Sequence, residues 1–199
     1  MGRDKALLPW PPLSPGAPAP AGSQTFLTAQ IDLLKRSTDL VIVVAGANAR
    51  RLEPLVYAAG AFLAVNPHPE LGQFSSLRVG VQEVLSRGRD AALITLVDRP
   101  PVVPATAQQL RQAFLEQISR GMWAVVPEYN GRHGHPVIVG REMITAFLAA
   151  PATATARDVE HANQNHIAYV QVEDARIALN VDTPEDYERL GREGASPAR

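Results

Sequence analysis

The stretch 39–46, with the sequence DLVIVVAG, decides how this chain is expected to fold. It is a continuous run of apolar, mostly β-branched residues, and a second apolar run, AALITLVD, covers residues 91–98. A strand with one wet face alternates apolar and polar side chains, whereas a strand covered on both faces is apolar throughout. The two runs therefore predict buried strands in a sheet that carries helices on both faces.

Segments with apolar residues at helical spacing lie between the predicted strands. From residue 23 to residue 121 the predicted order is helix, strand, helix, strand, helix, strand, helix, over the segments 23–37, 39–46, 47–60, 61–67, 74–88, 91–98 and 104–121. Ser75 and Ser76 are placed to cap the start of the third helix. This alternation predicts an α/β fold with a mostly parallel central sheet and right-handed crossovers.

The pattern of elements changes after residue 121. Residues 122–140 are predicted to form two strands around a polar, glycine-containing loop, and two further helices are predicted over 142–150 and 156–165. Residues 166–174 alternate like a half-buried strand, and residues 175–191 are predicted to form a strand followed by a final helix. Thr183 is the predicted N-cap of that helix, and Pro184 is its predicted first residue.

The chain of 199 residues is expected to form a single domain, residues 1–199. Residues 11–22, PPLSPGAPAPAG, are predicted to be a mobile, proline-rich loop insertion on the surface, because proline lacks a backbone donor and fixes its own backbone near extended geometry. Residues 193–199 are predicted to be a disordered tail.

Composition excludes several classes of function. The net charge of −1 gives no support to binding of nucleic acid or of an acidic membrane surface. No apolar run approaches the roughly 18 residues of a membrane span, so no membrane association is expected. The absence of cysteine excludes disulfides and thiolate chemistry and fits a reducing compartment, so the predicted localisation is cytoplasmic.

Two predicted strands end in a carboxylate, at the edge where open α/β sheets bind their ligands. Asp98 closes the apolar run 91–98, and Asp182 closes the last predicted strand. Magnesium accepts a few hard oxygen ligands and keeps several waters, so these carboxylates suit a Mg²⁺ site. The alternative is structural: Asp98 could form a turn before Arg99, and Asp182 could cap the last helix. Both interpretations stay open at this point.

Other polar clusters carry weaker signals. His133 and His135 in the loop 131–137 have a spacing that transition metals can use, but without a third ligand a solvated or substrate-facing loop is favoured. Asn66, Ser75 and Ser76 follow a predicted strand, where helix-start amides could hold an anion or a base edge. Such residues are also ordinary turn formers. The sequence lacks a G-x-S-x-G elbow, a Walker lysine motif and a complete G-x-G-x-x-G.

Six fragments in chain order carry a resemblance to a known family. They are MGRDKALLPW (1–10), NPHPELGQFSSLRVGV (66–81), LVDRPPV (96–102), GRHGHPV (131–137), TARDV (155–159) and NVDTPEDYERL (180–190). Together they resemble the MobA-like NTP-transferase domain, with the molybdenum cofactor cytidylyltransferases as the nearest branch. The resemblance runs the length of the chain and implies a three-layer, Rossmann-like nucleotidyltransferase fold.

The resemblance implies a reaction as well. Enzymes of this family join a nucleoside monophosphate from an NTP to a phosphorylated acceptor and release pyrophosphate. The acceptor oxygen attacks the α-phosphorus in line, so catalysis depends on positioning, on Mg²⁺ and on a cation that meets the growing phosphate charge. The implied partners are CTP or GTP, with CTP preferred, and a small acceptor of the molybdopterin type; a molybdoenzyme or its chaperone is a further candidate partner.

Motif matching also implies roles for individual residues. Lys5 matches a catalytic lysine that touches the phosphates, and Asp98 and Asp182 match magnesium-binding acids, with Asp98 also catalytic. Asn180 lies two residues before Asp182 and would face the same way on a strand. The implied nucleotide contacts are Gly2, Arg3, Lys5, Asn66, Ser75 and Ser76. The implied acceptor contacts are Gly134, His135, Pro136 and Arg157.

The chain departs from the family pattern in two places. The family pattern begins with a buried strand and a Gly-rich turn, of which only the tail, residues 1–5, matches here. Met1 is therefore predicted to be an internal methionine, and the missing strand is expected to belong in the middle of the sheet. Arg99 stands where the family more often has an uncharged residue, so it is expected either to pair with a phosphate or to perturb the metal site.

Two functional hypotheses follow from the sequence. The first is a Mg²⁺-dependent nucleotidyltransferase. The second is a catalytically degenerate accessory protein that binds a pterin cofactor or a partner protein, and it is favoured if the chain truly starts at Met1. The sequence leaves the base, the acceptor and the oligomeric state open.

Overall fold

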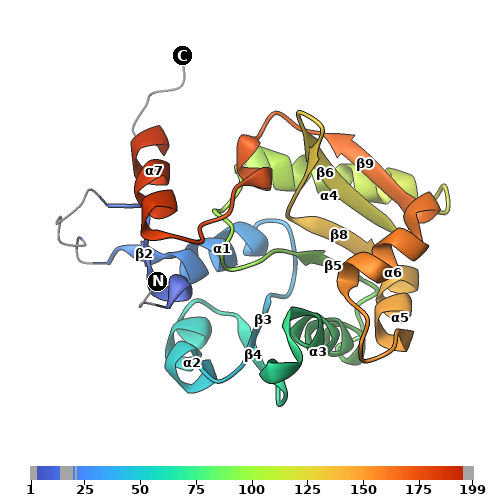
Figure 1. Cartoon of the computed structure of the whole chain (residues 1–199), viewed down its shortest axis with the longest axis horizontal. Helices are drawn as coiled ribbons and strands as arrows, with labels where there is room; N and C mark the ends of the chain where they lie inside the picture. The colour runs from blue at the N-terminus through green and yellow to red at the C-terminus, as the bar shows by residue number, and fades with distance from the viewer. Residues whose placement is uncertain (1–3, 14–19, 21, 195–199) are drawn as a thin grey trace.

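The computed structural model describes residues 4–13, 20 and 22–194, drawn in colour in Figure 1. Gly2 and Arg3, most of the predicted proline-rich loop and residues 195–199 of the predicted tail therefore lie outside the described residues. The helices are α1 (Phe26–Lys35), α2 (Ala49–Ala58), α3 (Gln73–Ser86), α4 (Pro104–Ile118), α5 (Arg141–Ala149), α6 (Ala156–Ala162) and α7 (Pro184–Gly194). Single 3-10 turns are η1 (Lys5–Leu7), η2 (Pro69–Leu71), η3 (Gln164–His166) and η4 (Ala175–Ala178).

The described strands confirm the predicted order of helices and strands between residues 23 and 121. They are β1 (Pro9–Trp10), β2 (Gln24–Thr25), β3 (Ile42–Ala45), β4 (Phe62–Val65), β5 (Ala91–Ile94), β6 (Ala124–Tyr129), β7 (Arg132–His133), β8 (Val137–Gly140) and β9 (Ile167–Gln171). The short pair β1–β2 is antiparallel and lies outside the main sheet.

The main sheet consists of two parts. Strand β3 pairs with β4 in parallel, and the second part has the order β5-β8-β6-β7, with β9 parallel to β6. Strand β8 runs against both β5 and β6, so β5, β6 and β9 share one direction. An ion pair of 2.7 Å between Arg89 Nη2 and Asp39 Oδ2 joins the segments that precede β5 and β3. The amino ends of β3 and β5 therefore lie side by side, and most strands run the same way.

Helices cover both faces of the sheet. Adjacent residues of β6 point into different cores: Ala124 packs with the apolar residues of α3 and α5, and Val125 packs with those of α4. On β8, Val139 packs with the apolar residues of α3 and α5, and Ile138 packs with those of α4. This alternation is that of a strand buried on both sides. The expected three-layer, Rossmann-like α/β fold is confirmed, with α4 against one face and α3 and α5 against the other (Figure 1).

Strands β3 and β5 are less buried than their sequences predict. Only Ala45 of β3 is fully buried, and no residue of β5 is. The physical reason is the sheet order, because within the described part of the chain each of these strands has a partner on one edge only. The partial exposure therefore arises at one edge of each strand, and the prediction of helices on both faces stands.

Two local predictions are wrong. Residues 175–178 form the 3-10 turn η4 in place of a strand, because the Asp174 carboxylate accepts a hydrogen bond from Arg176 N (3.1 Å) and so caps a turn. Ser75 and Ser76 lie inside the first turn of α3, and its N-cap is Gly72. By contrast, Thr183 does cap α7: its hydroxyl accepts from Asp186 N (3.1 Å).

The first described residues pack against the last helix. Trp10 meets Phe26 edge to face at 5.0 Å, and Phe26 lies 6.1 Å from the Tyr187 ring. The Tyr187 hydroxyl donates to Pro9 O at 2.8 Å. These contacts hold β1 against the start of α7, beside α1 (Figure 1). None of the helices among the described residues has the length and apolar character needed to cross a membrane.

Asp174 is a buried carboxylate that joins two distant segments, and its removal tests the fold. It accepts from Val103 N (2.8 Å) and Thr106 Oγ1 (3.1 Å) at the start of α4. We expect Asp174→Ala to lower the free energy of unfolding by about 2–4 kcal/mol, because buried donors lose their acceptor. Urea unfolding measures the effect, and Glu173→Ala, an exposed carboxylate next to it, is the matched control. An equal loss of unfolding free energy in the two variants would contradict the role of Asp174 in joining the two segments.

Candidate active site

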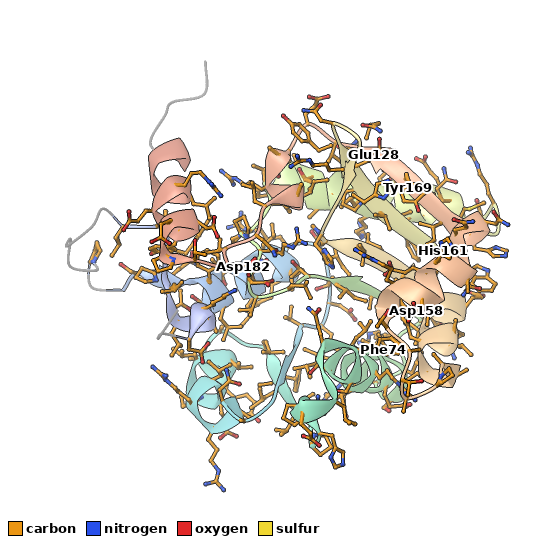
Figure 2. The ribbon with its side chains drawn as sticks, in the orientation of Figure 1. Phe74, Glu128, Asp158, His161, Tyr169 and Asp182 are labelled. Carbon is orange, nitrogen blue, oxygen red and sulfur yellow. The ribbon has the colours of Figure 1, made fainter. Side chains whose placement is uncertain are left out.

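An ion pair between the two ends of the chain forms the centre of the candidate site. Lys5 Nζ lies 2.8 Å from Asp182 Oδ1, and Asn180 Nδ2 donates to Asp182 Oδ2 at 3.0 Å. The hydrogen bond from Lys5, followed by that from Asn180, lowers the pKa of Asp182. Asn180 and Asp182 thus lie together as expected, although the segment that carries them is not a strand. Figure 2 labels Asp182 between α7 and the amino-terminal segment.

Asp98 is held beside this group by the backbone. Val181 N donates to Asp98 O at 2.8 Å, which places Asp98 next to the residue that precedes Asp182. Asp98 Oδ1 is buried and has no hydrogen-bond partner among the described residues. A buried carboxylate oxygen without a partner is costly unless a ligand meets it. The structure therefore brings together Lys5, Asp98 and Asp182, the three residues to which the resemblance gives catalysis and metal binding.

Two aspartates that sequence reasoning missed organise the site. Asp4 accepts from Ala6 N (3.1 Å) and from Asn48 Nδ2 (2.9 Å), which caps η1 and ties it to the turn after β3. Asp186 accepts from the backbone N of Asp182 (3.1 Å), which fixes the backbone position of Asp182. The capping pattern from residue 183 to residue 186 could have indicated this role of Asp186. The role of Asp4 depends on a contact with Asn48, 44 positions away, which no local pattern reveals.

The predicted base and ribose contacts lie together in one turn. Asn66 is buried, and its amide donates to Ser75 Oγ (2.8 Å) and Ser76 Oγ (2.9 Å). Its carbonyl oxygen accepts from His68 N at 2.9 Å. Both the side-chain nitrogen and the side-chain oxygen of Asn66 therefore have partners, and Asn66 organises the turn from β4 to α3. Ser76 lines the same cavity as Lys5 and Asp98.

The predicted acceptor loop packs against η4. His135 N donates to Ile177 O at 3.0 Å, and a Cβ added to Gly134 would lie 2.0 Å from the same oxygen, so only glycine fits there. His135 is half-buried, and its buried Nδ1 atom has no partner among the described residues. Burial, and secondarily the charge of Arg99, lowers the pKa of His135 to about 4.

Arg99 connects the turn after β5 to the segment that carries Asp182. Its Nη1 lies 3.3 Å from both Ile177 O and Leu179 O, and its own carbonyl accepts from the buried Gln30 side chain (2.8 Å). Its buried Nε has no partner in the described part of the chain. The guanidinium therefore holds the segment 177–179 in place. Its pairing with a phosphate and its effect on a metal site stay predictions.

Arg157 is not brought into this group. It lies at the start of α6, and Figure 2 labels its neighbour Asp158 well apart from Asp182. Gly2 and Arg3 lie outside the described residues. The functional roles of these three residues stay predictions.

His133 and His135 lie in different environments. His133 is exposed, stacks on Tyr169 at 4.1 Å and contacts Glu128 Oε2 at 3.2 Å, whereas His135 is half-buried and its backbone N–H bonds to η4. Figure 2 labels Glu128 and Tyr169 well apart from Asp182. In the described ranges no group of three or more histidine, aspartate or glutamate side chains is placed to hold a metal ion by itself.

The acidic pair still fits one class of metal. Mg²⁺ binds through one or two carboxylates, several waters and substrate phosphates, and so does not require a complete protein cage. The unpartnered Asp98 Oδ1 and the exposed Asp182 carboxylate supply hard oxygens of this kind. Lys5 supplies a cation at the same place. The arrangement can therefore bind a polyphosphate together with a divalent ion, at the edge where open α/β sheets bind their ligands.

Comparison with known proteins identifies the family of this chain. Residues 1–167 match the family described as the MobA-like NTP transferase domain, and the chain belongs to that family of nucleotidyltransferases. It is 24% identical to the molybdenum cofactor cytidylyltransferase of Escherichia coli (strain K12), over 94% of this chain and 86% of that protein. It is 29% identical to the phosphoenolpyruvate guanylyltransferase of Sphaerobacter thermophilus, over 78% of this chain and 70% of that protein.

A solved structure shows the same fold. The manganese complex of Rv0371c from Mycobacterium tuberculosis H37Rv superposes with a TM-score of 0.70 at 24% identity, over 96% of this chain and 93% of that one.

The environment of Asp182 leads to a prediction about its titration. Lys5→Met removes the first cause of the lowered pKa, so we expect the pKa of Asp182 to rise toward its ordinary value. In the unaltered protein the stabilisation is present above the unfolded-state pKa and is lost as the pH falls through the lowered folded-state pKa. Carboxyl-carbon NMR titration measures the shift. Lys35→Met, which removes a lysine bound to Ala59 O, is the control and should leave Asp182 unchanged.

The buried His135 ring leads to a second prediction. Because its pKa is lowered to about 4, we expect the ring to stay neutral at pH 5 and the folded state to lose stability as the pH falls from 6.5 toward 4. Arg99→Met should raise the pKa of His135, but not to its usual value, since burial is the larger cause. Imidazole NMR titration of both proteins measures this. A His135 that is protonated at pH 5 in the unaltered protein would contradict the buried geometry.

Proposed function

We propose that this protein is a Mg²⁺-dependent nucleotidyltransferase that transfers CMP from CTP to a phosphorylated, molybdopterin-type acceptor and releases pyrophosphate. The observation that carries the proposal is the junction of Lys5, Asp182 and Asp98 at the carboxyl end of β5. A cation, two carboxylates and an unpartnered buried oxygen at one place suit a polyphosphate with a divalent ion. Family membership supports NTP transfer in general.

Each residue of the site has a distinct part in the proposed reaction. The acceptor phosphate oxygen attacks the α-phosphorus of CTP, the bond to the β-phosphate oxygen breaks, and pyrophosphate leaves with that electron pair. Lys5 meets the charge that grows on the phosphates. Asp98 and Asp182 would hold Mg²⁺, which supplies charge neutralisation to the triphosphate when bound. Asn180 and Asp186 orient Asp182 through the hydrogen bonds described above.

The choice of base and acceptor has separate support. The Escherichia coli relative, whose name gives a cytidylyl transfer to molybdenum cofactor, covers more of this chain than the relative named for phosphoenolpyruvate guanylyl transfer. We therefore propose CTP and a molybdopterin acceptor, and treat GTP with phosphoenolpyruvate as the pair to be excluded. The turn that the buried Asn66 organises is the proposed place for the nucleotide, since Ser76, which follows this turn, lines the cavity with Lys5.

Substitution of Asp98 tests the proposal. We expect Asp98→Asn to lower kcat/KM for CTP-dependent pyrophosphate release by about 10²-fold or more, because the metal loses a charged ligand. Asp90→Asn is the matched control: this exposed carboxylate lies at the other end of β5, where it pairs with Arg141. EDTA should abolish the release of pyrophosphate, and added Mg²⁺ should restore it.

The same assay distinguishes the substrates. CTP and GTP are each tested with molybdopterin and with phosphoenolpyruvate as acceptor, at equal concentrations. Turnover of GTP with phosphoenolpyruvate in preference to CTP with molybdopterin would overturn the proposed specificity. Calorimetry that finds no binding of either NTP in the presence of Mg²⁺ would overturn the proposed function.

A further inference from the structure

The turn between β3 and α2 carries an asparagine whose side chain does not serve its own helix. Asn48 is the N-cap residue of α2, a position where asparagine is favoured because its side-chain oxygen can accept a hydrogen bond from the first turn. Here it makes no such bond, and its backbone, with φ of −89° and ψ of 5°, lies outside the extended region that N-cap residues usually adopt. The start of α2 therefore lacks a stabilising contact that its residue type could supply.

The side chain of Asn48 binds the amino-terminal turn η1 instead. Its Nδ2 donates to Asp4 Oδ2 at 2.9 Å. The other carboxylate oxygen, Asp4 Oδ1, accepts from Ala6 N at 3.1 Å, and Asp4 O accepts from Leu7 N at 3.0 Å. Asp4 is thus the N-cap of η1, and its two carboxylate oxygens have separate tasks. One oxygen holds the turn together, and the other attaches the turn to Asn48.

Asn48 is itself held in place by the backbone of α2. Its carbonyl oxygen accepts from Leu52 N at 3.2 Å, in the first turn of that helix. Ala49 and Leu52 are buried in the same apolar cluster as Ala6 of η1. The start of α2 and η1 therefore share one packed core, and the exposed hydrogen bond between Asn48 and Asp4 joins them at the surface.

The first residue of η1 is Lys5, whose ammonium group lies in the candidate active site. Lys5 Nζ pairs with Asp182 Oδ1 at 2.8 Å, and Lys5 O accepts from Leu8 N at 3.1 Å. A lysine side chain has a flexible four-carbon stem, so its cation keeps one position only if the backbone that carries it is fixed. The cap of η1 fixes that backbone, and Asn48 holds the residue that forms the cap.

We propose that Asn48 is a positioning residue for nucleotide transfer, which acts through Asp4 to hold η1 so that Lys5 Nζ meets the phosphates. The inference rests on the proposed function for the role of Lys5, and on the hydrogen bonds of η1 for the role of Asn48. Negative charge on the phosphates grows in the transition state, so a displaced cation costs more there than in the bound substrate. A loss of position is therefore expected in kcat and much less in KM.

The chemistry of the two side chains allows this hydrogen bond to be broken and rebuilt. In Asn48→Asp a carboxylate faces the Asp4 carboxylate, so the donor is lost and the two charges repel each other. In the double variant Asp4→Asn, Asn48→Asp the amide nitrogen at position 4 donates to the carboxylate at position 48, and the amide oxygen still accepts from Ala6 N. Aspartate and asparagine are equally good N-cap residues, so neither variant weakens α2.

Kinetics and amide exchange on the full 199-residue chain test the inference. We expect Asn48→Asp to lower kcat for CTP-dependent pyrophosphate release by about 10-fold or more, with KM for CTP changed by less than about 2-fold. Without nucleotide or metal, amide exchange at Ala6 and Leu8 should become about 10-fold faster, because η1 loses its attachment. Tm should move by less than about 4 °C. The double variant is the matched control and should restore kcat and both exchange rates to within about 3-fold of the unaltered protein.

Each outcome decides the question. A fall in kcat with faster exchange in η1 for Asn48→Asp, both reversed by the double variant, supports the proposal. An unchanged kcat, a fall without faster exchange, or a fall that the double variant does not reverse overturns it. A fall in Tm well beyond 4 °C also overturns it, because Asn48 would then serve the stability of α2. If the unaltered protein releases no pyrophosphate from CTP or GTP, the proposed function fails, and the exchange rates still decide whether Asn48 holds η1.

Discussion

The backbone hydrogen bond from Val181 N to Asp98 O, 2.8 Å long, joins two segments on which the rest of the site depends. It fixes the end of strand β5 against the residues that lead into α7. The same bond fixes the positions of Asn180 and Asp182, since these two residues lie on either side of Val181. Arg99 reinforces the junction through the carbonyls of Ile177 and Leu179, and Gln30 secures Arg99 from α1. Backbone geometry therefore brings the Asp98 and Asp182 carboxylates to one place; Asp182 is bound there by Lys5 and Asn180, whereas Asp98 Oδ1 has no partner among the described residues.

The sequence predicts those features that local chemistry determines. Strands β3 and β5 were evident from apolar runs, and the start of α7 from Thr183 and Pro184. Turn η4 was not, because the strand-like pattern of residues 175–182 gives way to a cap by Asp174, whose other partners belong to α4. Ser75 and Ser76 were assigned to a cap, whereas Gly72, with φ of 87°, begins the helix. In both cases tertiary contacts or backbone angles decided the local structure, against the structure that the residue types alone favour.

The sequence predicted which residues belong to the site, but it did not predict how they are arranged. The resemblance supplied Lys5, Asp98 and Asp182, and the structure brings them together; no local pattern gives the ion pair between Lys5 and Asp182 or the capping by Asp4. The burial of His135 and the anchoring role of Arg99 depend on η4, which the sequence did not predict. The unpaired edges of β3 and β5 among the described strands follow from sheet order, a tertiary property that apolar runs do not specify.

The pairing of Lys5 with Asp182 has a consequence for the timing of folding during synthesis. The two residues are 177 positions apart, and Tyr187 fastens the same region to Pro9. On a ribosome the α/β core up to β9 can collapse as it emerges, because its contacts are formed by segments already made. The site itself cannot assemble until α7 has left the exit tunnel. A nascent chain therefore holds Asp98 in a folded sheet while Val181 and Asp182 are still untranslated, and the ion pair between Lys5 and Asp182 forms only after α7 has emerged.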